Sequence, residues 1–161
     1  MQSESTAEHK WLQQMVGEWE FEHECNLGPD QPPMKSSGRE VVRAVGDLWV
    51  QGEMTGIMPD DGGTMTAFMA LGYDPVKGKF VGTWYGSPMA HMFVYEGERE
   101  ADGNTLPLNT TGPSFTDPTK TARYRDIVEI VSEDERELRS ECEMEDGSWV
   151  PFMKGVYRRV K

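Results

Sequence analysis

The 161-residue chain is poor in cysteine and has no long apolar run. Its two cysteines, Cys25 and Cys142, are too few for a disulfide framework and too far apart for a metal-ligand motif. No stretch approaches the roughly 20 apolar residues that a membrane-spanning helix needs. Residues 1–10 lack the basic start and the apolar segment of a signal peptide. We therefore expect a cytoplasmic protein with no membrane segment and with reduced thiols.

Basic residues are scarce as well. The chain has 16 Lys and Arg against 28 Asp and Glu, which gives a formal net charge of −12. Nucleic acids and anionic membranes attract basic surfaces, so neither is expected as a partner. The length fits one domain that spans residues 1–161, and the sequence leaves a homodimer open.

Helical spacing occurs in one segment only, residues 5–16. Its apolar residues recur at helical intervals, at Trp11, Leu12, Met15 and Val16. Ser5 and Glu8 fit the two ends of a capping box, and Gly17 is a natural stop. We therefore expect one short N-terminal helix.

The rest of the chain reads as strands. Over residues 18–25 every even position is Glu and every odd position is suited to burial, which is the alternation of a half-buried strand. Similar short runs, separated by turn residues, follow to the end of the chain. The expected strands cover residues 17–26, 37–46, 47–56, 64–73, 79–87, 91–98, 104–112, 121–132, 135–145 and 148–159.

Ten consecutive strands without room for crossover helices predict an all-β fold, a closed antiparallel meander β-barrel. The connections then alternate between two ends, and the helix lies at the bottom, where it could plug the barrel. Four of the five top connections combine proline with Met or Phe, namely Gly28–Met34, Ile57–Pro59, Ser87–Met89 and Gly112–Phe115. Loops carry function on such scaffolds, so we place a site at this top end, the mouth.

Gly17-Glu18-Trp19 opens the first strand and Tyr157-Arg158-Arg159 ends the last. This arrangement resembles the calycin superfamily, whose barrels pack a basic residue of the last strand on that tryptophan. Longer segments are similar to the bacterial family called domain of unknown function 1579: His9–Glu20, Gly28–Pro33, Leu71–Pro75, Val94–Gly97 and Gly112–Thr116. The resemblance implies a calycin-like barrel and no established activity.

The alternation indicates which basic residue packs on Trp19. In a closed barrel the last strand lies between the first and the ninth, whose outer faces are largely acidic. Opposite charges on neighbouring strands stabilise a sheet, so Lys154 and Arg158 are expected outside. Arg159 has the other parity and points inward to Trp19, where a cation–π contact stabilises by roughly 0.5–2 kcal/mol.

Aromatic and methionine residues share the inward parity near the mouth. We predict that the barrel binds a small, largely apolar molecule there. The aromatic side chains would stack on it and the histidines would orient a polar end. Gly82 and Gly86 alternate with bulky residues and are expected to leave room inside. The expected ligand-binding residues are His23, Met69, Trp84, His91, Phe93 and Tyr95.

Two other classes of function stay open. The protein could be a hydrolase or isomerase that uses His23 or His91 as general base, or an interaction protein with a filled core. Zinc would need His23, Cys25 and His91 to converge across the barrel. A haem-binding barrel family of similar fold has a Gly-rich motif in its first strand, which is absent here. We therefore predict no cofactor, no metal and no catalytic residue.

The cysteines have inward parity at similar height. The last strand lies between their two strands, which puts their backbones roughly 9–10 Å apart. A disulfide needs Cα atoms within about 7 Å, so we expect two free thiols.

Overall fold

The computed structural model describes residues 1–26, 28–58 and 63–161. In these residues one helix is followed by ten consecutive strands, as expected. They are α1 (Ala7–Gln13), β1 (Gly17–Cys25), β2 (Met34–Val45), β3 (Trp49–Ile57), β4 (Thr64–Asp74), β5 (Lys79–Gly86), β6 (Met89–Gly97), β7 (Thr105–Pro113), β8 (Thr121–Ser132), β9 (Glu135–Glu143) and β10 (Trp149–Arg159).

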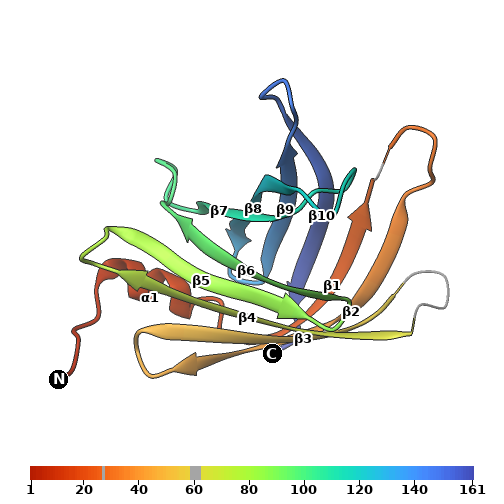
Figure 1. The fold of residues 1–161 in the computed structure, drawn as a ribbon. Coiled ribbons are helices and arrows are strands. Elements are labelled where there is room, and N and C mark those ends of the chain that lie inside the picture. Colours follow the sequence, from red (N-terminus) through yellow and green to blue (C-terminus); the bar gives the residue numbers. More distant parts are fainter. Residues whose placement is uncertain (27, 59–62) are drawn as a thin grey trace.

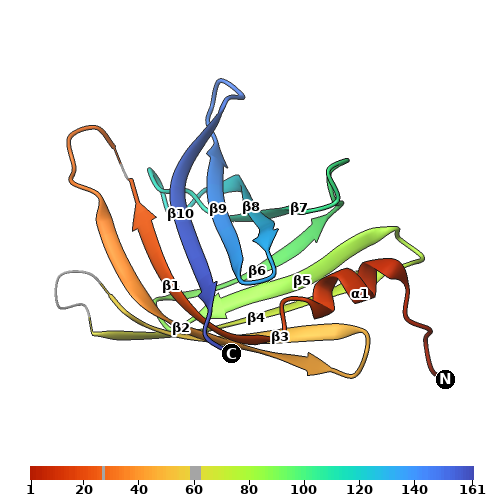
Figure 2. The ribbon, with the colours of Figure 1, turned by 180° about the vertical axis from the view of Figure 1, so that it is seen from behind.

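The strands form a closed antiparallel barrel in the order β1-β10-β9-β8-β7-β6-β5-β4-β3-β2, as Figures 1 and 2 show. The predicted fold class is therefore confirmed. The bounds of β8 agree with the prediction, and β2 begins three residues earlier, at Met34 rather than residue 37. Pro59, in the second of the predicted mouth connections, lies outside the described residues.

The helix is shorter than predicted, and the predicted capping box was wrong by one residue. Thr6 is the N-cap, and His9 replaces Glu8 as its reciprocal partner. The backbone N–H of Thr6 donates to Nδ1 of His9, and His9 Nε2 lies 2.9 Å from the carbonyl oxygen of Tyr73. His9 therefore caps the helix and ties it to β4, which frees Glu8 to pair with Arg99 at 3.6 Å.

The apolar side of α1 covers the bottom of the barrel. Trp11, Leu12 and Met15 are buried, and the Trp11 ring packs edge-on against Phe80 of β5 at 5.7 Å between centroids. In Figure 2 the helix lies beside β3, β4 and β5. The amphipathic spacing thus places α1 at the end opposite the mouth.

Trp19 is the centre of the basal core, with 2% of its surface exposed. Its indole N–H donates to the carbonyl oxygen of Met15 at 2.9 Å, and the Arg159 guanidinium lies 4.3 Å from the ring centroid. Arg159 also donates to the carbonyl oxygens of Val16 and Gln14. The last strand is thereby fastened to the turn between α1 and β1.

A second cation on Trp19 was missed by the sequence prediction. Arg136 of β9 lies 4.6 Å from the Trp19 ring centroid and 4.2 Å from that of Tyr157. Its guanidinium donates to the carboxylate of Glu40 on β2, and both charged side chains are about 4% exposed. The ion pair is thus enclosed in the basal core and joins two strands that are not neighbours.

The described register between β6 and β7 consists of a single pair, Glu96 with Asn109. By contrast, β7 and β8 pair continuously from Thr105 with Glu129 to Pro113 with Thr121. This weakly paired contact, the β6–β7 seam, is also bridged by the Asn109 side chain, which donates to the carbonyl oxygen of Glu96 at 3.2 Å.

Replacing Trp19 by alanine should destabilise the fold by about 3–5 kcal/mol, because it opens a large cavity beneath two cations. Urea unfolding of Trp19→Ala measures this loss. Arg158→Ala, which removes an exposed cation from the same end of β10, is the matched control and should cost less than about 1 kcal/mol. An unchanged midpoint for Trp19→Ala would contradict the packing described above.

Removing one member of the buried ion pair should be more costly than removing both. Arg136→Leu leaves Glu40 buried and uncompensated, which should lower the unfolding free energy by about 3–5 kcal/mol. The double variant Glu40→Leu with Arg136→Leu should recover part of that loss. A double variant whose loss equals the sum of the two single losses would show that the pair is not coupled.

Candidate functional site

The inside of the barrel differs between its two halves. In the lower half the inward side chains are buried, and Phe80, Leu106, Leu108 and Tyr157 are at most 1% exposed. Toward the mouth one set of inward side chains is only half-buried. This upper set, called the upper lumen, comprises His23, Cys25, Met65, Met69, Trp84, His91, Phe93 and Met153. The barrel is therefore filled at its base and accessible to solvent near the mouth.

Aromatic side chains of β5, β6 and β8 form one wall of the upper lumen, the aromatic wall. Phe93 packs against Trp84, His91 and Tyr124, with ring centroids 6.0, 4.7 and 6.3 Å apart. Met69 of β4 stands opposite Trp84 in the register, and Trp84 stands opposite Phe93. Four of the predicted site residues are thus brought together: Met69, Trp84, His91 and Phe93.

The glycines of β5 do not leave the open room that the sequence analysis expected. A Cβ atom on Gly86 would lie 2.9 Å from the Trp84 ring, and one on Gly82 would lie 2.7 Å from a methyl group of Leu71. The space at Gly86 is taken up by the Trp84 ring, and that at Gly82 by the Ala70 carbonyl oxygen and the Leu71 side chain. These glycines therefore allow close packing of the wall rather than a cavity behind it.

Tyr95 lies deeper than the rest of the predicted set and is 2% exposed. Its hydroxyl donates to the carboxylate of Asp126 on β8, which also accepts from the Ser140 hydroxyl at 2.6 Å. Burial raises the pKa of Asp126, while the bonds from Ser140 and Tyr95 act in the opposite direction. Tyr95 and Asp126 thus form part of a polar floor below the aromatic wall, and the sequence analysis did not identify Asp126.

His23 lies on β1, apart from the aromatic wall. Its Nε2 atom is 2.6 Å from the hydroxyl oxygen of Tyr157, and its ring packs on that of Phe21 at 4.5 Å. Burial, followed by the nearby Arg136 guanidinium, lowers the pKa of His23 to about 4. The imidazole is therefore neutral at pH 7.

His91 lies on the opposite wall, because β1 and β6 are five strands apart in either direction around the barrel. Its Nε2 atom is 2.9 Å from the carbonyl oxygen of Thr111, so the side chain bridges the β6–β7 seam. The described hydrogen bonds of the two histidines lead to Tyr157 and to a carbonyl group, and neither leads to Cys25. This arrangement does not assemble a nucleophile with its base.

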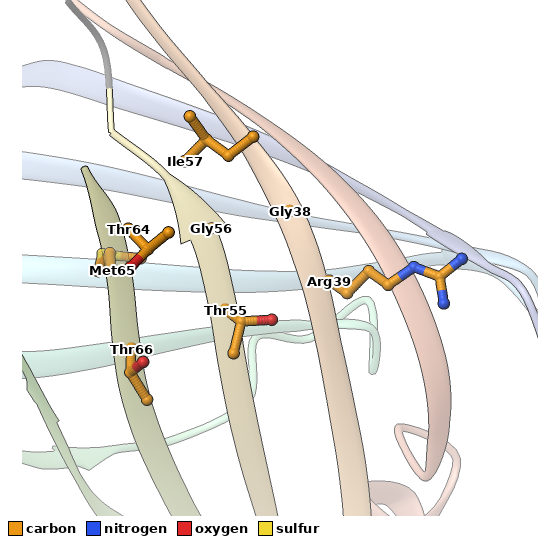
Figure 3. Close-up of a pocket in the computed structure, with 8 residues that line it drawn as sticks. All are labelled: Gly38, Arg39, Thr55, Gly56, Ile57, Thr64, Met65 and Thr66. Carbon is orange, nitrogen blue, oxygen red and sulfur yellow. The ribbon is translucent and has the colours of Figure 1, made fainter. Parts of the chain in front are cut away.

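Two cavities lie against the strands on the other side of the barrel. One of about 440 Å³ is lined by Gly38, Arg39, Thr55, Gly56, Ile57, Thr64, Met65 and Thr66. In Figure 3 Arg39 and Thr55 project from the outer side of β2 and β3, and Met65 points the other way. The second, of about 640 Å³, lies along β10, β1 and β2 and is lined largely by charged and hydroxyl side chains, including Glu22, Lys35 and Lys154. Each cavity shares one residue with the upper lumen, Met65 for the first and His23 for the second.

Both cysteines are free thiols, as predicted, and half-buried. Cys25 stands opposite Met153 of β10, and burial raises the pKa of its thiol, which slows its reaction at neutral pH. Among residues 1–26, 28–58 and 63–161, no three His, Cys, Asp or Glu side chains are grouped to hold a metal ion. No helix within these ranges has the length and apolarity to cross a membrane.

Acid should destabilise the protein through His23. Its pKa is about 4 when folded and 6.5 when unfolded, so between these values the unfolded chain binds more protons. The unfolding free energy should therefore fall as the pH falls through this window, by up to about 3 kcal/mol. Urea unfolding at several pH values measures the slope for the wild type and for His23→Phe. The variant should lose this part of the pH dependence, and identical slopes would contradict the assignment.

Comparison with solved structures shows the same fold in distant proteins. Rv2717c from M. tuberculosis is 14% identical, with a TM-score of 0.66 over 98% of this chain and 100% of that chain. The S-type phycobiliprotein lyase CPES from Guillardia theta is 13% identical, with a TM-score of 0.63 over 94% of this chain and 92% of that chain. At these identities the likeness concerns the fold.

Sequence comparison is more specific. A search of curated proteins finds no match. A family model described as a protein of unknown function, DUF1579, matches residues 4–159, nearly the whole barrel including the helix. The chain therefore belongs to the DUF1579 family, as its resemblance to that family implied.

Proposed function

We propose that this protein binds a small, largely apolar molecule in the upper lumen. The observation that carries the proposal is the contrast between the two halves of the barrel. Apolar side chains that face inward are completely buried at the base, whereas Met69, Trp84 and Phe93 remain partly exposed near the mouth. Burying this surface against a ligand would remove apolar area from water, which favours binding.

The chemistry of the upper lumen fits such a ligand. Trp84 and Phe93 offer ring faces and edges to a flat molecule. Met65 and Met69 have flexible thioether side chains that adapt to irregular apolar shapes. Two polar groups, His23 and His91, stand on opposite walls of an otherwise apolar site, which is typical of small-molecule sites.

The two alternatives predict different behaviour. A barrel with a filled core would take up no apolar molecule at the mouth. An enzyme with a histidine base would need a reacting group within hydrogen-bond reach, and the described partners of His23 and His91 are Tyr157 and the Thr111 carbonyl. Binding is the function that the described contacts favour.

Uptake of a fluorescent apolar probe tests the proposal. N-phenyl-1-naphthylamine should bind the wild type with an increase in fluorescence. Trp84→Ala should weaken its affinity roughly threefold to tenfold, because stacking on an aromatic ring contributes about 0.5–1.5 kcal/mol beyond area burial. Tyr85→Ala is the matched control, since Tyr85 is the next residue of β5 and faces outward. It should leave the affinity unchanged.

Circular dichroism and urea unfolding verify that both variants are folded. No uptake by the wild type would favour the filled core and overturn the proposal. Equal weakening by Trp84→Ala and Tyr85→Ala would place the probe on the outer surface and would overturn the assignment to the upper lumen.

A further inference from the structure

We infer that the ligand is an uncharged aromatic molecule with a hydrogen-bond acceptor at one end and a donor at the other. In this arrangement His23 donates to the acceptor and His91 accepts from the donor. The inference rests on the proposed function and adds the chemical class of the ligand. It depends on which nitrogen of each imidazole carries the proton, and the hydrogen bonds on the far side of each ring decide this.

The bond to Thr111 determines the tautomer of His91. A carbonyl oxygen only accepts hydrogen bonds, so Nε2, which lies 2.9 Å from it, carries a proton. In the neutral imidazole the other nitrogen, Nδ1, then has a free lone pair. The ring is half-buried and packs edge-on against Phe93, within the aromatic wall. No hydrogen bond to Nδ1 of His91 occurs among the described residues, so we assign it as the acceptor at the mouth.

The bond to Tyr157 determines the tautomer of His23. Tyr157 is completely buried, so its hydroxyl proton needs an acceptor within the protein. The described partner of that hydroxyl is Nε2 of His23, at 2.6 Å. Tyr157 therefore donates to Nε2, and the neutral ring carries its proton on Nδ1. The low pKa of His23, about 4, agrees with a neutral ring.

The contacts of His23 also fix the direction of this proton. A Cβ atom built on Gly155 of β10 would lie 2.4 Å from Cδ2 and 2.8 Å from Nε2 of His23. This edge of the imidazole is thus pressed against β10, and Nδ1 lies on the edge turned away from it. No hydrogen bond to Nδ1 occurs among the described residues. It is a half-buried donor on the inner face of β1, one position below Cys25 along that face.

The two histidines belong to opposite walls of the upper lumen. His23 and His91 belong to strands on opposite sides of the barrel, and Met69, Trp84 and Phe93 lie between them around one wall. A molecule that spans the upper lumen between these two strands meets a donor at one end and an acceptor at the other.

The charges near the site favour an uncharged ligand. Below the upper lumen, the charges of Glu40 and Arg136 neutralise each other. The net charge of −12 disfavours an anionic ligand. The carboxylate of the polar floor, Asp126, already accepts from the hydroxyls of Tyr95 and Ser140, and the Arg136 guanidinium disfavours a cationic ligand. A hydroxyaryl ketone has the required chemistry.

Four probes with the same naphthalene ring system separate the two hydrogen bonds: naphthalene, 2-naphthol, 2-acetylnaphthalene and 2-acetyl-6-hydroxynaphthalene. Their affinities are measured by displacement of N-phenyl-1-naphthylamine from the full-length protein at pH 7. In the wild type the acetyl group and the hydroxyl group should each tighten binding by about threefold to tenfold, since a hydrogen bond contributes about 0.5–1.5 kcal/mol. The probe that has both groups should bind most tightly.

Two variants assign each gain to its histidine. His23→Phe should abolish the gain from the acetyl group and retain that from the hydroxyl group, and His91→Phe should do the reverse. Tyr85→Phe, which alters a hydroxyl on the outer face of β5, should retain both gains. The comparison of the four probes on the wild type does not require any variant to fold.

The outcomes separate this inference from the proposed function. If no probe displaces N-phenyl-1-naphthylamine and the dye itself does not bind, the proposed function fails. If the four probes bind the wild type with equal affinity, the function stands and the inference is overturned. If His23→Phe removes the gain from the hydroxyl group instead, the two tautomers are reversed and the inference is likewise overturned.

Discussion

The buried ion pair between Arg136 and Glu40 is the interaction on which the rest of the barrel depends. It links β9 to β2 across β10 and β1, the two strands that bring the ends of the chain together. Trp19 and Tyr157 enclose the guanidinium between aromatic rings, which excludes water from the pair. Either charge alone would be buried without a partner, which is costly, so both side chains must meet for the barrel to be stable. The register of the four strands β2, β1, β10 and β9 is therefore coupled to this one contact.

Tyr157 connects this ion pair at the base with His23 in the upper lumen. Its ring packs on Arg136, while its hydroxyl reaches His23 in the upper lumen. Burial is the larger cause of the low pKa of His23, and the same cation that stabilises the base lowers this pKa further. A structural feature of the lower half thereby contributes to keeping neutral a group that we place in the binding site.

The fold could be predicted because strict alternation, as over residues 18–25, specifies both strand and face, and a meander of such strands leaves few arrangements. The positions of Trp84, His91 and Phe93 followed from the same parity. Glu40 and Arg136 could not be paired from the sequence, since they are 96 positions apart and their contact depends on the register of strands that are not neighbours. Asp126 was missed for the same reason, because its role depends on Tyr95 and Ser140, which lie on other strands.

The β6–β7 seam has a consequence for the volume of the barrel. Where two strands share a full set of backbone hydrogen bonds, their separation is fixed at about 4.8 Å. At the β6–β7 seam the described pairing is Glu96 with Asn109, and the side chains of Asn109 and His91 supply further hydrogen bonds between the two strands. His91 and Phe93 belong to the strand on one side of the seam. The width of the upper lumen is therefore least constrained by backbone hydrogen bonds along the aromatic wall.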